Sequence, residues 1–404
     1  MAPAGRPQVL IVRDTRESGE MLESALAAGV AAAGGDAILG GVLPTPGAAL
    51  LVRRHGLDVA AVISASHNPF ADNGIKFFGA DGTKLSDDRE AAIESALDAP
   101  GGGTSIGRTR QLHGADRDYL RELEAHFEGL RLDGMRVLLD CANGATWQVG
   151  PEMFRRLGAE VEAVGVSPDG RNINAGCGST HVEALAERMA AGGFDVGFAF
   201  DGDGDRVLAV DRNGAVVDGD ELIALAALHL RKEGRLPGNG VAVTVMTNYG
   251  FHTAMDQAGI EVATTAVGDR HVLAELQRRG WALGGEQSGH IIDTGFVPSG
   301  DGIAAALLAI EALGGGDLAE RAAMEKLPQR LVNVRVRDRA AAAESQALSQ
   351  AVEQESRALE GRGRVLVRPS GTEPVVRVMA EAPEPSECDE VVGRLVGLIE
   401  RELA

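Results

Sequence analysis

The sequence predicts an α/β protein built from several related domains, followed by a smaller α+β domain. Short runs of β-branched residues alternate with stretches rich in Ala, Leu and Glu, as strands and helices do in α/β folds. The same strand-then-helix unit recurs, so we expect similar domains to be used several times. The units are Val9 to Val12 before Ser18 to Ala33, Val137 to Leu139 before Pro151 to Leu157, Val196 to Phe200 before Glu221 to Lys232, and Val241 to Met246 before Phe251 to Ala258.

The last part of the chain differs in character. A strand-like run at Val332 to Val336 leads to a helix rich in Ala, Glu and Gln. Then follow the strand-like runs Val365 to Val367 and Val375 to Met379, separated by a polar loop, and a last helix at Asp389 to Leu403. This order predicts a small, separate α+β domain.

Loops and changes in composition indicate where the domains end. Gly101 to Ser105 is typical of a surface loop or linker, and we expect the first domain to end shortly after it, near Asp116. The expected domains are residues 1–116, 117–220, 221–328 and 329–404.

The bulk properties limit the class of partner. The chain has 404 residues, 44% of them hydrophobic, and a formal net charge of -20. That charge argues against a broad surface for nucleic acid or anionic membrane, whereas a small anionic ligand held locally by Arg, Lys and backbone N–H groups remains open. Cys141, Cys177 and Cys388 are odd in number and widely separated, which argues against a disulfide framework or a zinc site. No signal sequence or apolar stretch of ~20 residues is present, so we expect a cytoplasmic protein.

Asp201, Asp203 and Asp205 alternate with glycines directly after the apolar run Val196 to Phe200. Side chains two residues apart on an extended chain point the same way, and glycine lets the backbone curl, so three oxygens can converge on one cation. A hard cation such as Mg²⁺ fits oxygen ligands best. An ordinary surface turn is the alternative. A helix–loop–helix calcium loop is excluded, because Arg206 and Arg212 stand where its Gly and Glu would be.

A possible nucleophile, Ser66, follows another apolar run, Val59 to Ile63. His67 is a poor base for it, because adjacent residues point in different directions and no Gly-x-Ser-x-Gly turn surrounds the serine. A serine that carries phosphate explains the segment better, since the phosphate could share a cation with the three aspartates. Alternatively, Ser66 only caps a turn before Asn68 and Pro69.

Three further groups of residues can bind or react. The loop Gly284 to His290 brings together Glu286, Ser288 and His290, which suits sugar hydroxyls or a cationic amine, although it could be a polar turn. The segment Arg368 to Arg377 carries Ser370, Gly371 and Thr372 and can form a phosphate cradle, unless Arg368 only pairs with Glu373. Lys76, expected in the loop region of Ser66, can act as acid or base if desolvated, or else it is a surface lysine.

These loops follow predicted strands, where open α/β sheets place their ligands. Together they resemble the motifs of the α-D-phosphohexomutase superfamily, over nearly the whole chain. The resembling stretches are Ser64-Ala65-Ser66-His67-Asn68-Pro69, Asp201-Gly202-Asp203-Gly204-Asp205-Arg206, Gly285-Glu286-Gln287-Ser288-Gly289-His290 and Arg368-Pro369-Ser370-Gly371-Thr372-Glu373-Pro374. Within it, Gln287 and the stretch Asn174 to His181 look like the bacterial phosphoglucosamine mutase family, since related phosphomannomutases usually have Met where Gln287 stands.

The resemblance implies three related α/β domains and a smaller C-terminal α+β domain around a central cleft. It also implies a role for each matching residue. Ser66 would be the phosphoserine, which shares Mg²⁺ with Asp201, Asp203 and Asp205; Arg206 would neighbour the transferring phosphate, and Lys76 and His290 would be acid/base candidates; Glu286 and Ser288 would contact the sugar, and Arg368, Ser370, Gly371, Thr372 and Arg377 would hold the phosphate that does not react.

The reaction implied is the interconversion of glucosamine 6-phosphate and glucosamine 1-phosphate, which supplies UDP-N-acetylglucosamine for the cell wall. It would run through a bisphosphorylated sugar, after a hexose bisphosphate or a kinase has first phosphorylated the serine. The partner is then a small sugar phosphate, and a homodimer is possible. The alternatives are a phosphomannomutase/phosphoglucomutase of broad specificity and a catalytically weak protein that binds sugar phosphates.

One segment departs from the family pattern. Members usually have a strand and a Phe-Gly-Thr-Asp-Gly-x-Arg-Gly loop before the part that matches Val9 to Gly19, and nothing of that kind precedes Val9 here. Because this loop normally helps to line the cleft, its loss is expected to weaken phosphate handling and to expose a sheet edge or apolar surface. A different start codon, a shortened chain and a genuine variant would look the same in the sequence.

Overall fold

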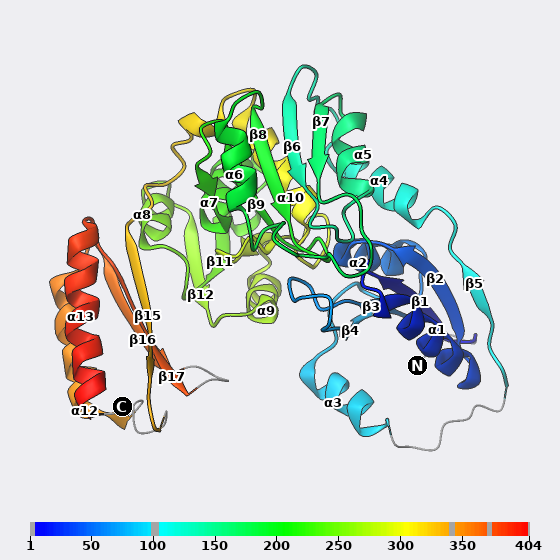
Figure 1. Ribbon diagram of the computed structural model, residues 1–404, viewed down its shortest axis with the longest axis horizontal. Coiled ribbons are helices and arrows are strands. Elements are labelled where there is room, and N and C mark those ends of the chain that lie inside the picture. Colours follow the sequence, from blue (N-terminus) through cyan, green and yellow to red (C-terminus); the bar gives the residue numbers. More distant parts are fainter. Residues whose placement is uncertain (1–4, 98–104, 339–343, 370–373, 403–404) are drawn as a thin grey trace. The chain divides into compact units, whose positions relative to one another are not determined.

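The computed structural model describes residues 5–97, 105–338, 344–369 and 374–402 (Figure 1). The chain divides into two compact units. Unit 1 comprises residues 1–246 and 260–322, and unit 2 comprises residues 247–259 and 323–404. The four domain boundaries expected from the sequence are a finer division than this and stay a prediction.

Unit 1 contains three mixed sheets in its described residues. The first has the order β4-β3-β1-β2-β5 and consists of β1 (Gln8–Arg13), β2 (Asp36–Val42), β3 (Val59–Ile63), β4 (Ile75–Gly79) and β5 (Thr109–Gln111). The second has the order β10-β9-β8-β6-β7 and consists of β6 (Arg136–Asp140), β7 (Glu160–Val164), β8 (Val196–Phe200), β9 (Val207–Asp211) and β10 (Val216–Val217). The third has the order β12-β11-β13-β14 and consists of β11 (Gly240–Thr244), β12 (Glu261–Thr265), β13 (Leu283–Gly285) and β14 (Ile291–Asp293).

The three sheets repeat one arrangement, which confirms the related α/β domains expected from the sequence. In each, a central strand pairs in parallel with two neighbours: β1 with β2 and β3, β6 with β7 and β8, and β11 with β12 and β13. A fourth strand then runs antiparallel to the last of these: β4 beside β3, β9 beside β8, and β14 beside β13. The loops with Ser66, with Asp201 to Arg206 and with Glu286 to His290 therefore occupy the same position in three copies of one unit.

Helices pack on these sheets as the alternation of sequence predicts. In the first sheet, Ile11, Ala61 and Ile63 point to one face, where they pack against Leu26 and Ala27 of a helix. The helices of unit 1 are α1 (Ser18–Ala32), α2 (Thr45–Arg54), α3 (Asp87–Ser95), α4 (Ala115–His126), α5 (Val149–Arg156), α6 (Glu183–Ala190), α7 (Gly219–Lys232), α9 (Asp269–Arg279) and α10 (Gly302–Leu313), with short 3-10 turns at Pro237–Asn239 and Leu318–Glu320. Most of α10 is buried, as expected of a helix that is apolar on all sides.

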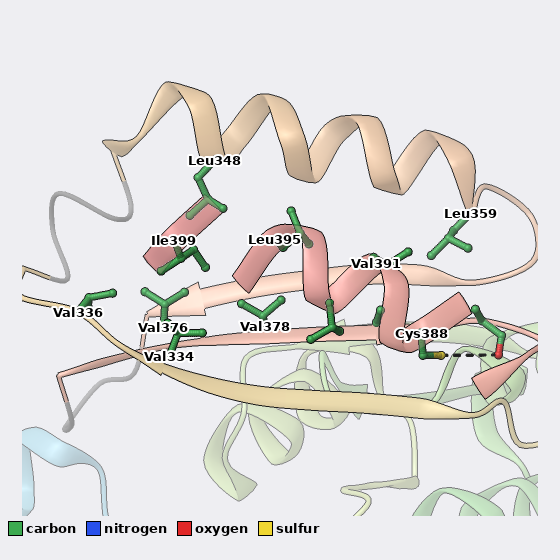
Figure 2. Close-up of a cluster of buried hydrophobic side chains, with 13 residues drawn as sticks. Val334, Val336, Leu348, Leu359, Val376, Val378, Cys388, Val391, Leu395 and Ile399 are labelled. Atoms are coloured by element: carbon green, nitrogen blue, oxygen red, sulfur yellow. Dashed lines mark hydrogen bonds between the residues drawn. The ribbon is translucent and has the colours of Figure 1, made fainter. Parts of the chain in front are cut away.

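Unit 2 contains the small α+β domain that the tail of the sequence predicts. Its antiparallel sheet has the order β15-β17-β16, from β15 (Gln329–Arg335), β16 (Arg364–Pro369) and β17 (Val375–Glu381). The helices α12 (Gln346–Ala358) and α13 (Pro385–Glu402) supply the other half of its core. Figure 2 shows Val376 and Val378 of the sheet with Leu348 of α12 and Leu395 and Ile399 of α13, all buried.

Helix α8 (Tyr249–Gln257) also belongs to unit 2, although it precedes the rest of that unit by many residues. The buried carboxylate of Glu381 explains this. It accepts hydrogen bonds from the backbone N–H of Tyr249 at 2.8 Å, from Arg364 Nε at 2.7 Å and from Gln329 Nε2 at 2.9 Å. Arg364 also donates to the Thr247 carbonyl at 2.6 Å, so one ion pair fastens the start of α8 to the C-terminal sheet.

Among the described residues, no helix has the length and apolar character needed to span a membrane.

Candidate active site

Asp201, Asp203 and Asp205 lie in the turn from β8 to β9 and are buried. Each offers a carboxylate oxygen, and these oxygens lie within 4.8 Å of one another. One oxygen each of Asp203 and Asp205 is buried without a hydrogen-bond partner. Buried, unpartnered carboxylate oxygens in one place are the donors that a hard divalent cation prefers, so the residues present fit Mg²⁺.

The electrostatics of this group point the same way. Burial, together with the negative charges of Asp205 and Asp203, raises the pKa of Asp201 well above its usual range. Burial would also raise the pKa of Asp205, but His290, Lys76 and Arg206 outweigh burial and lower it. A cation bound among the three carboxylates would remove the repulsion that Asp201 experiences.

Ser66 reaches this group directly from the loop after β3. Its Oγ donates to Asp201 Oδ2 at 2.6 Å, so the expected nucleophile and a metal-ligand candidate are in contact. His67 Nδ1 lies 3.4 Å from the same Oγ, and burial followed by the charge of Arg206 lowers the pKa of His67. Ser66 itself is mostly buried and has a φ of 51°, which is unusual for a residue other than glycine.

Lys76 lies in strand β4 and not in the loop region where the sequence analysis expected it. Residues Ile75–Gly79 pair with β3, with Lys76 opposite Val62, because the chain turns back before this point. From the strand, Lys76 Nζ donates to Asp203 Oδ2 at 2.7 Å and lies 4.0 Å from Asp205 Oδ2. Burial would lower the pKa of Lys76, but the two carboxylates outweigh it and raise that pKa above its ordinary value.

His290 faces Asp205 from the loop between β13 and β14, with Nδ1 3.5 Å from Asp205 Oδ2. Its other ring nitrogen, Nε2, accepts a hydrogen bond from the backbone N–H of Gly300 at 3.1 Å. The ring N–H on Nδ1 is directed at Asp205. Burial would lower the pKa of His290, but Asp205 outweighs burial and raises it. In this geometry both nitrogens are engaged within the protein.

Arg206 follows the aspartates directly. Its backbone N–H donates to Asp201 Oδ1 at 3.2 Å, and its Nε lies 3.8 Å from Asp205 Oδ1. Burial would lower the pKa of Arg206, but the negative charges of Asp205, Asp201 and Asp203 outweigh burial and raise it. The guanidinium therefore stays charged beside the carboxylates.

The residues expected to contact the sugar differ in their contacts within the protein. Glu286 Oε1 accepts from the backbone N–H of Gly268 at 3.0 Å, and Ser288 is exposed. Gln287 Nε2 donates to Asp218 Oδ2 at 3.2 Å, and Asp218 caps helix α7. Gln287 thus fixes the loop to the start of α7.

The expected phosphate cradle belongs to unit 2. Arg368 on β16 and Arg377 on β17 are opposite one another in the register of the sheet. Burial and the charge of Arg377 lower the pKa of Arg368, so the two guanidinium groups repel each other. Ser370, Gly371 and Thr372 lie outside the residues that the structure describes.

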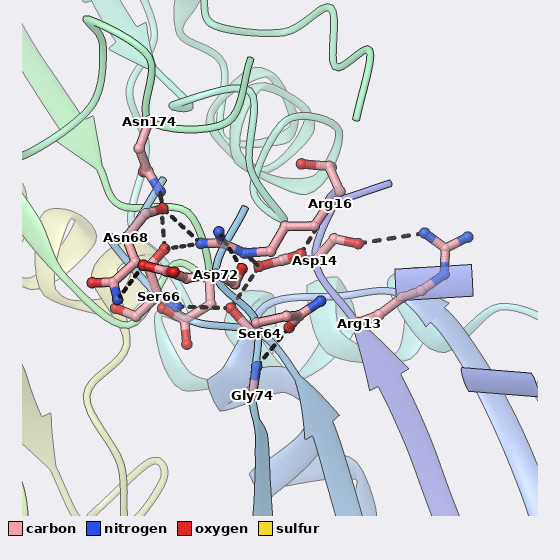
Figure 3. A network of polar contacts seen from close by, with 12 residues as sticks. Arg13, Asp14, Arg16, Ser64, Ser66, Asn68, Asp72, Gly74 and Asn174 are labelled. Atoms are coloured by element: carbon pink, nitrogen blue, oxygen red, sulfur yellow. Dashed lines mark hydrogen bonds and ion pairs between the residues drawn. The ribbon is translucent and has the colours of Figure 1, made fainter. Parts of the chain in front are cut away.

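Sequence reasoning missed three residues that contact the site. Thr45 Oγ1 donates to Asp203 Oδ2 at 2.7 Å, and both Arg16 and Asn174 hold the Ser66 carbonyl, at 2.8 and 2.9 Å (Figure 3). Arg16 could have been found, because the charged residues Asp14 to Arg16 follow the apolar strand β1 as the other functional loops follow theirs. Thr45 also follows a strand, β2, but it is an uncharged residue between Pro44 and Pro46, a pattern typical of an ordinary turn.

Comparison with known proteins agrees with this arrangement. Profiles of the phosphoglucomutase/phosphomannomutase family match in order: alpha/beta/alpha domain I at residues 1–101, domain II at 117–214, domain III at 218–331 and the C-terminal domain at 331–398. Among solved structures, a phosphoglucomutase/phosphomannomutase family protein from Burkholderia thailandensis superposes with a TM-score of 0.83 at 23% identity, covering 99% of this chain and 91% of that one. The N-acetylphosphoglucosamine mutase of Aspergillus fumigatus, solved with GlcNAc-6P and magnesium, gives 0.66 at 19% identity, covering 88% and 92%.

Curated relatives are more similar in sequence. The phosphoglucosamine mutase of Pelotomaculum thermopropionicum is 51% identical over 400 residues, which cover 97% of this chain and 90% of the relative. That of Desulforudis audaxviator is 50% identical over 404 residues, again covering 90% of the relative. At such identity over nearly the full length of both chains, this chain belongs to the α-D-phosphohexomutase superfamily, in the family of the bacterial phosphoglucosamine mutases.

Proposed function

We propose that this enzyme interconverts glucosamine 6-phosphate and glucosamine 1-phosphate through a phosphorylated Ser66. The observation that carries the proposal is the contact of Ser66 Oγ with Asp201 in a group of three buried carboxylates. The names of similar relatives, phosphoglucosamine mutases at 46–51% identity, support the choice of sugar.

The reaction consists of two phosphoryl transfers. In the first, the bond between the phosphorus and Ser66 Oγ breaks as the free sugar hydroxyl attacks, and the proton of that hydroxyl passes to a base. The sugar, now bisphosphorylated, turns around so that its other phosphate faces Ser66. In the second, Ser66 Oγ attacks that phosphate, and the sugar oxygen that leaves takes up a proton. Such transfers depend on positioning and on neutralising charge.

Ser66, Asp201, Asp203 and Asp205 would hold Mg²⁺, as the unpartnered oxygens indicate. When bound, Mg²⁺ neutralises negative charge that accumulates on the transferring group. Magnesium and GlcNAc-6P in the Aspergillus fumigatus relative support this assignment. The first phosphorylation of Ser66 would come from a hexose bisphosphate or a kinase.

The remaining site residues take roles that fit their charges. Arg206 stays cationic beside Ser66 and would pair with the transferring phosphate. Glu286 would accept from the amine and hydroxyls of the sugar together with Ser288, and Arg368, Ser370, Gly371, Thr372 and Arg377 would hold the other phosphate. Of the two acid/base candidates, Lys76 has Nζ beside the carboxylates, whereas His290 acts on Asp205 and so orients that ligand.

Water has to be kept from phospho-Ser66 while the sugar turns, and the burial of Ser66, Asp201 and Asp203 serves this end. We place the enzyme in the cytoplasm, where sugar phosphates are made and used.

The test is mass spectrometry of the intact protein with peptide mapping of Ser66, before and after incubation with glucose 1,6-bisphosphate and Mg²⁺. We expect one phosphate on Ser66, lost on addition of excess glucosamine 6-phosphate, and none in Ser66→Ala. Turnover of glucosamine 1-phosphate should exceed that of mannose 1-phosphate and glucose 1-phosphate. A Ser66 that never carries phosphate would overturn the mechanism, and equal turnover of the three sugars would favour an enzyme of broad specificity.

A further inference from the structure

The backbone of Ser66 is held in a conformation that serine rarely adopts unaided. Its φ of 51° is in the left-handed region, which only glycine enters without strain. A strained residue in a loop persists only when its surroundings fix it. The side chains that fix Ser66 therefore decide where its Oγ lies.

Arg16 supplies most of this support, because its guanidinium is fully buried beneath the loop and all five of its N–H groups are used. Nε donates to Asp14 Oδ2 at 2.8 Å. The terminal nitrogens donate to four backbone carbonyls of the loop: Nη1 to Pro69 and, at 3.0 Å, to Asp72, and Nη2 to Ser66 at 2.8 Å and Asn68 at 2.9 Å (Figure 3). The Arg16 side chain thus holds together residues 66–72, the serine loop.

The backbone N–H of Ser66 is connected to the same ion pair. It donates to Ser64 Oγ at 2.9 Å, and that hydroxyl donates to Asp14 Oδ2 at 2.6 Å (Figure 3). Asp14 is the partner of Arg16. Both polar groups of the Ser66 backbone, the N–H and the carbonyl, therefore depend on the pair of Arg16 with Asp14.

A second side chain, that of Asn174, donates a hydrogen bond to the same Ser66 carbonyl. Asn174 Nδ2 donates to the carbonyls of Ser66 at 2.9 Å and Asn68 at 3.1 Å, and its own backbone N–H donates to Ala142. Gly202 of the aspartate turn packs against both partners: a Cβ there would lie 2.5 Å from the Ser66 carbonyl oxygen and 2.7 Å from Asn174 Nδ2. Asn174 thus joins the serine loop to the turn that carries the carboxylates.

We infer that Arg16 and Asn174 are positioning residues for phosphoryl transfer, which hold the Ser66 carbonyl from two sides and thereby fix Oγ against Asp201. The inference rests on the proposed function. Both residues act on backbone atoms of the loop, so their loss should lower kcat and leave KM for the sugar phosphate nearly unchanged. A misplacement of about 1 Å can cost about 10²-fold in rate.

Lysine cannot replace Arg16 in this role. It would keep the positive charge beside Asp14 but has three N–H groups on one atom, whereas the guanidinium presents five in a fixed planar fork. Arg16→Lys therefore keeps the positive charge but loses most of the hydrogen bonds, so it tests the hydrogen bonds alone.

The experiment compares Arg16→Lys, Asn174→Ala and the double variant with wild type. The readouts are kcat and KM for glucosamine 1-phosphate, and the ³¹P NMR signal of phospho-Ser66. We expect kcat to fall about 10²-fold in Arg16→Lys and about tenfold in Asn174→Ala, with KM within about threefold. The ³¹P signal should shift or split as the loop samples several positions. Because both residues bind the Ser66 carbonyl, the loss of kcat in the double variant should be smaller than the product of the two single losses.

Arg13→Ala is the matched control. Arg13 ends strand β1, three residues before Arg16, and pairs with Glu20 and Glu23. Its Nη1 also lies 3.4 Å from the Asp14 carbonyl, but no hydrogen bond joins it to the described residues of the loop after β3, so kcat and the ³¹P signal of Arg13→Ala should match wild type. In Arg16→Ala, added guanidinium chloride at low concentration should restore part of kcat, and an equal concentration of sodium chloride should not.

The outcomes separate this inference from the proposed function. Wild-type protein that never carries phosphate on Ser66 would overturn both. Active wild type together with folded variants whose kcat stays within about threefold would overturn the positioning role alone. Should Arg16→Lys fail to fold, Asn174→Ala decides, because it removes only two hydrogen bonds and leaves the pair of Arg16 with Asp14 intact.

Discussion

Three buried carboxylates within 4.8 Å of one another make the aspartate turn a place of strong repulsion unless a cation is bound. Lys76, Arg206 and His290 counter part of that repulsion, since all three lower the pKa of Asp205. The repulsion on Asp201 is not offset in this way, because burial and the charges of Asp205 and Asp203 raise its pKa. In the absence of a cation, the electrostatic destabilisation of this group therefore falls mainly on Asp201.

Asp201→Asn should stabilise the metal-free protein and abolish activity. The amide keeps an oxygen for Ser66 Oγ but carries no charge, so the repulsion falls. We expect a gain of about 1–3 kcal/mol in the free energy of unfolding with EDTA present. Thermal denaturation with EDTA and with Mg²⁺ measures this, and the rise in Tm that Mg²⁺ gives wild type should be lost. Asp133→Asn is the control: Asp133 is exposed and pairs with Arg131 at the surface, so the substitution should leave the rise in Tm with Mg²⁺ as in wild type. A less stable Asp201→Asn would contradict the argument.

Gly202→Ala should lower activity without removing any ligand. The new Cβ would meet the Ser66 carbonyl oxygen at 2.5 Å, so the serine loop has to move away from the aspartates. We expect a loss of about 10²-fold in kcat, measured with glucosamine 1-phosphate. The control is Gly29→Ala in α1, where nothing lies within 4 Å of a new Cβ and a small gain of about 0.5–1 kcal/mol in stability is expected. Unchanged kcat in Gly202→Ala would show that the loop can yield.

At the scale of elements, helix α10 depends on a buried carboxylate at its start. Asp301 Oδ1 accepts from the backbone N–H of Ala304 at 2.9 Å, and both its oxygens accept from the Tyr119 hydroxyl. Burial outweighs these bonds and raises the pKa of Asp301 to about 6. The side chain thus serves as a helix cap that costs stability when charged.

This cost should appear as a pH dependence. The folded protein binds a proton at Asp301 between its ordinary pKa of 3.8 and about 6, where the unfolded chain has released it. The free energy of unfolding should therefore fall as pH rises through this window. Relative to Asp301→Asn, which caps α10 without titrating, wild type should lose up to about 3 kcal/mol between pH 4 and 7. Urea denaturation of both proteins across this range is the measurement, and a constant difference would contradict the raised pKa.

Much of the site could be predicted from loops that follow strands. The runs of apolar residues before Ser66 and before Asp201 mark strands β3 and β8, and the ligand-bearing turns come directly after them. Lys76 was placed in a loop because one lysine between apolar residues carries no sign of an antiparallel return strand. The partners of Arg16 could not be predicted, because they are carbonyls 50 or more residues away, and any residue type supplies a carbonyl.

Local sequence also could not assign α8 to unit 2. The strand-then-helix pattern assigns Phe251 to Ala258 to the same domain as the strand before it. In the structure this segment forms most of α8, which belongs to unit 2 together with the C-terminal sheet. The cause is the buried pair of Glu381 with Arg364, whose members are over 100 residues from Tyr249. A long-range ion pair has no local pattern.

At the scale of the whole molecule, Glu381→Gln tests whether α8 depends on the C-terminal sheet. The amide accepts fewer and weaker hydrogen bonds than the carboxylate and removes the negative charge that faces Arg364. We expect a loss of about 1–3 kcal/mol and amide exchange about tenfold faster or more in α8 and β17, with β8 unchanged. Hydrogen–deuterium exchange with mass spectrometry measures it. Glu400→Gln, at an exposed position on α13, is the control; exchange that rises equally in β8 would show a global effect.

The repeated sheets of unit 1 have a consequence for how such an enzyme can diversify. The proposed nucleophile, metal ligands and sugar contacts each occupy the turn between a parallel strand and its antiparallel neighbour, once in each copy. A duplicated gene segment that already carried one such turn needs only a few substitutions there to acquire a new chemical task, while the strands that hold the turn keep their sequence. Selection can then alter the sugar that is accepted without disturbing the serine or the ion, because each task is inherited on a separate copy.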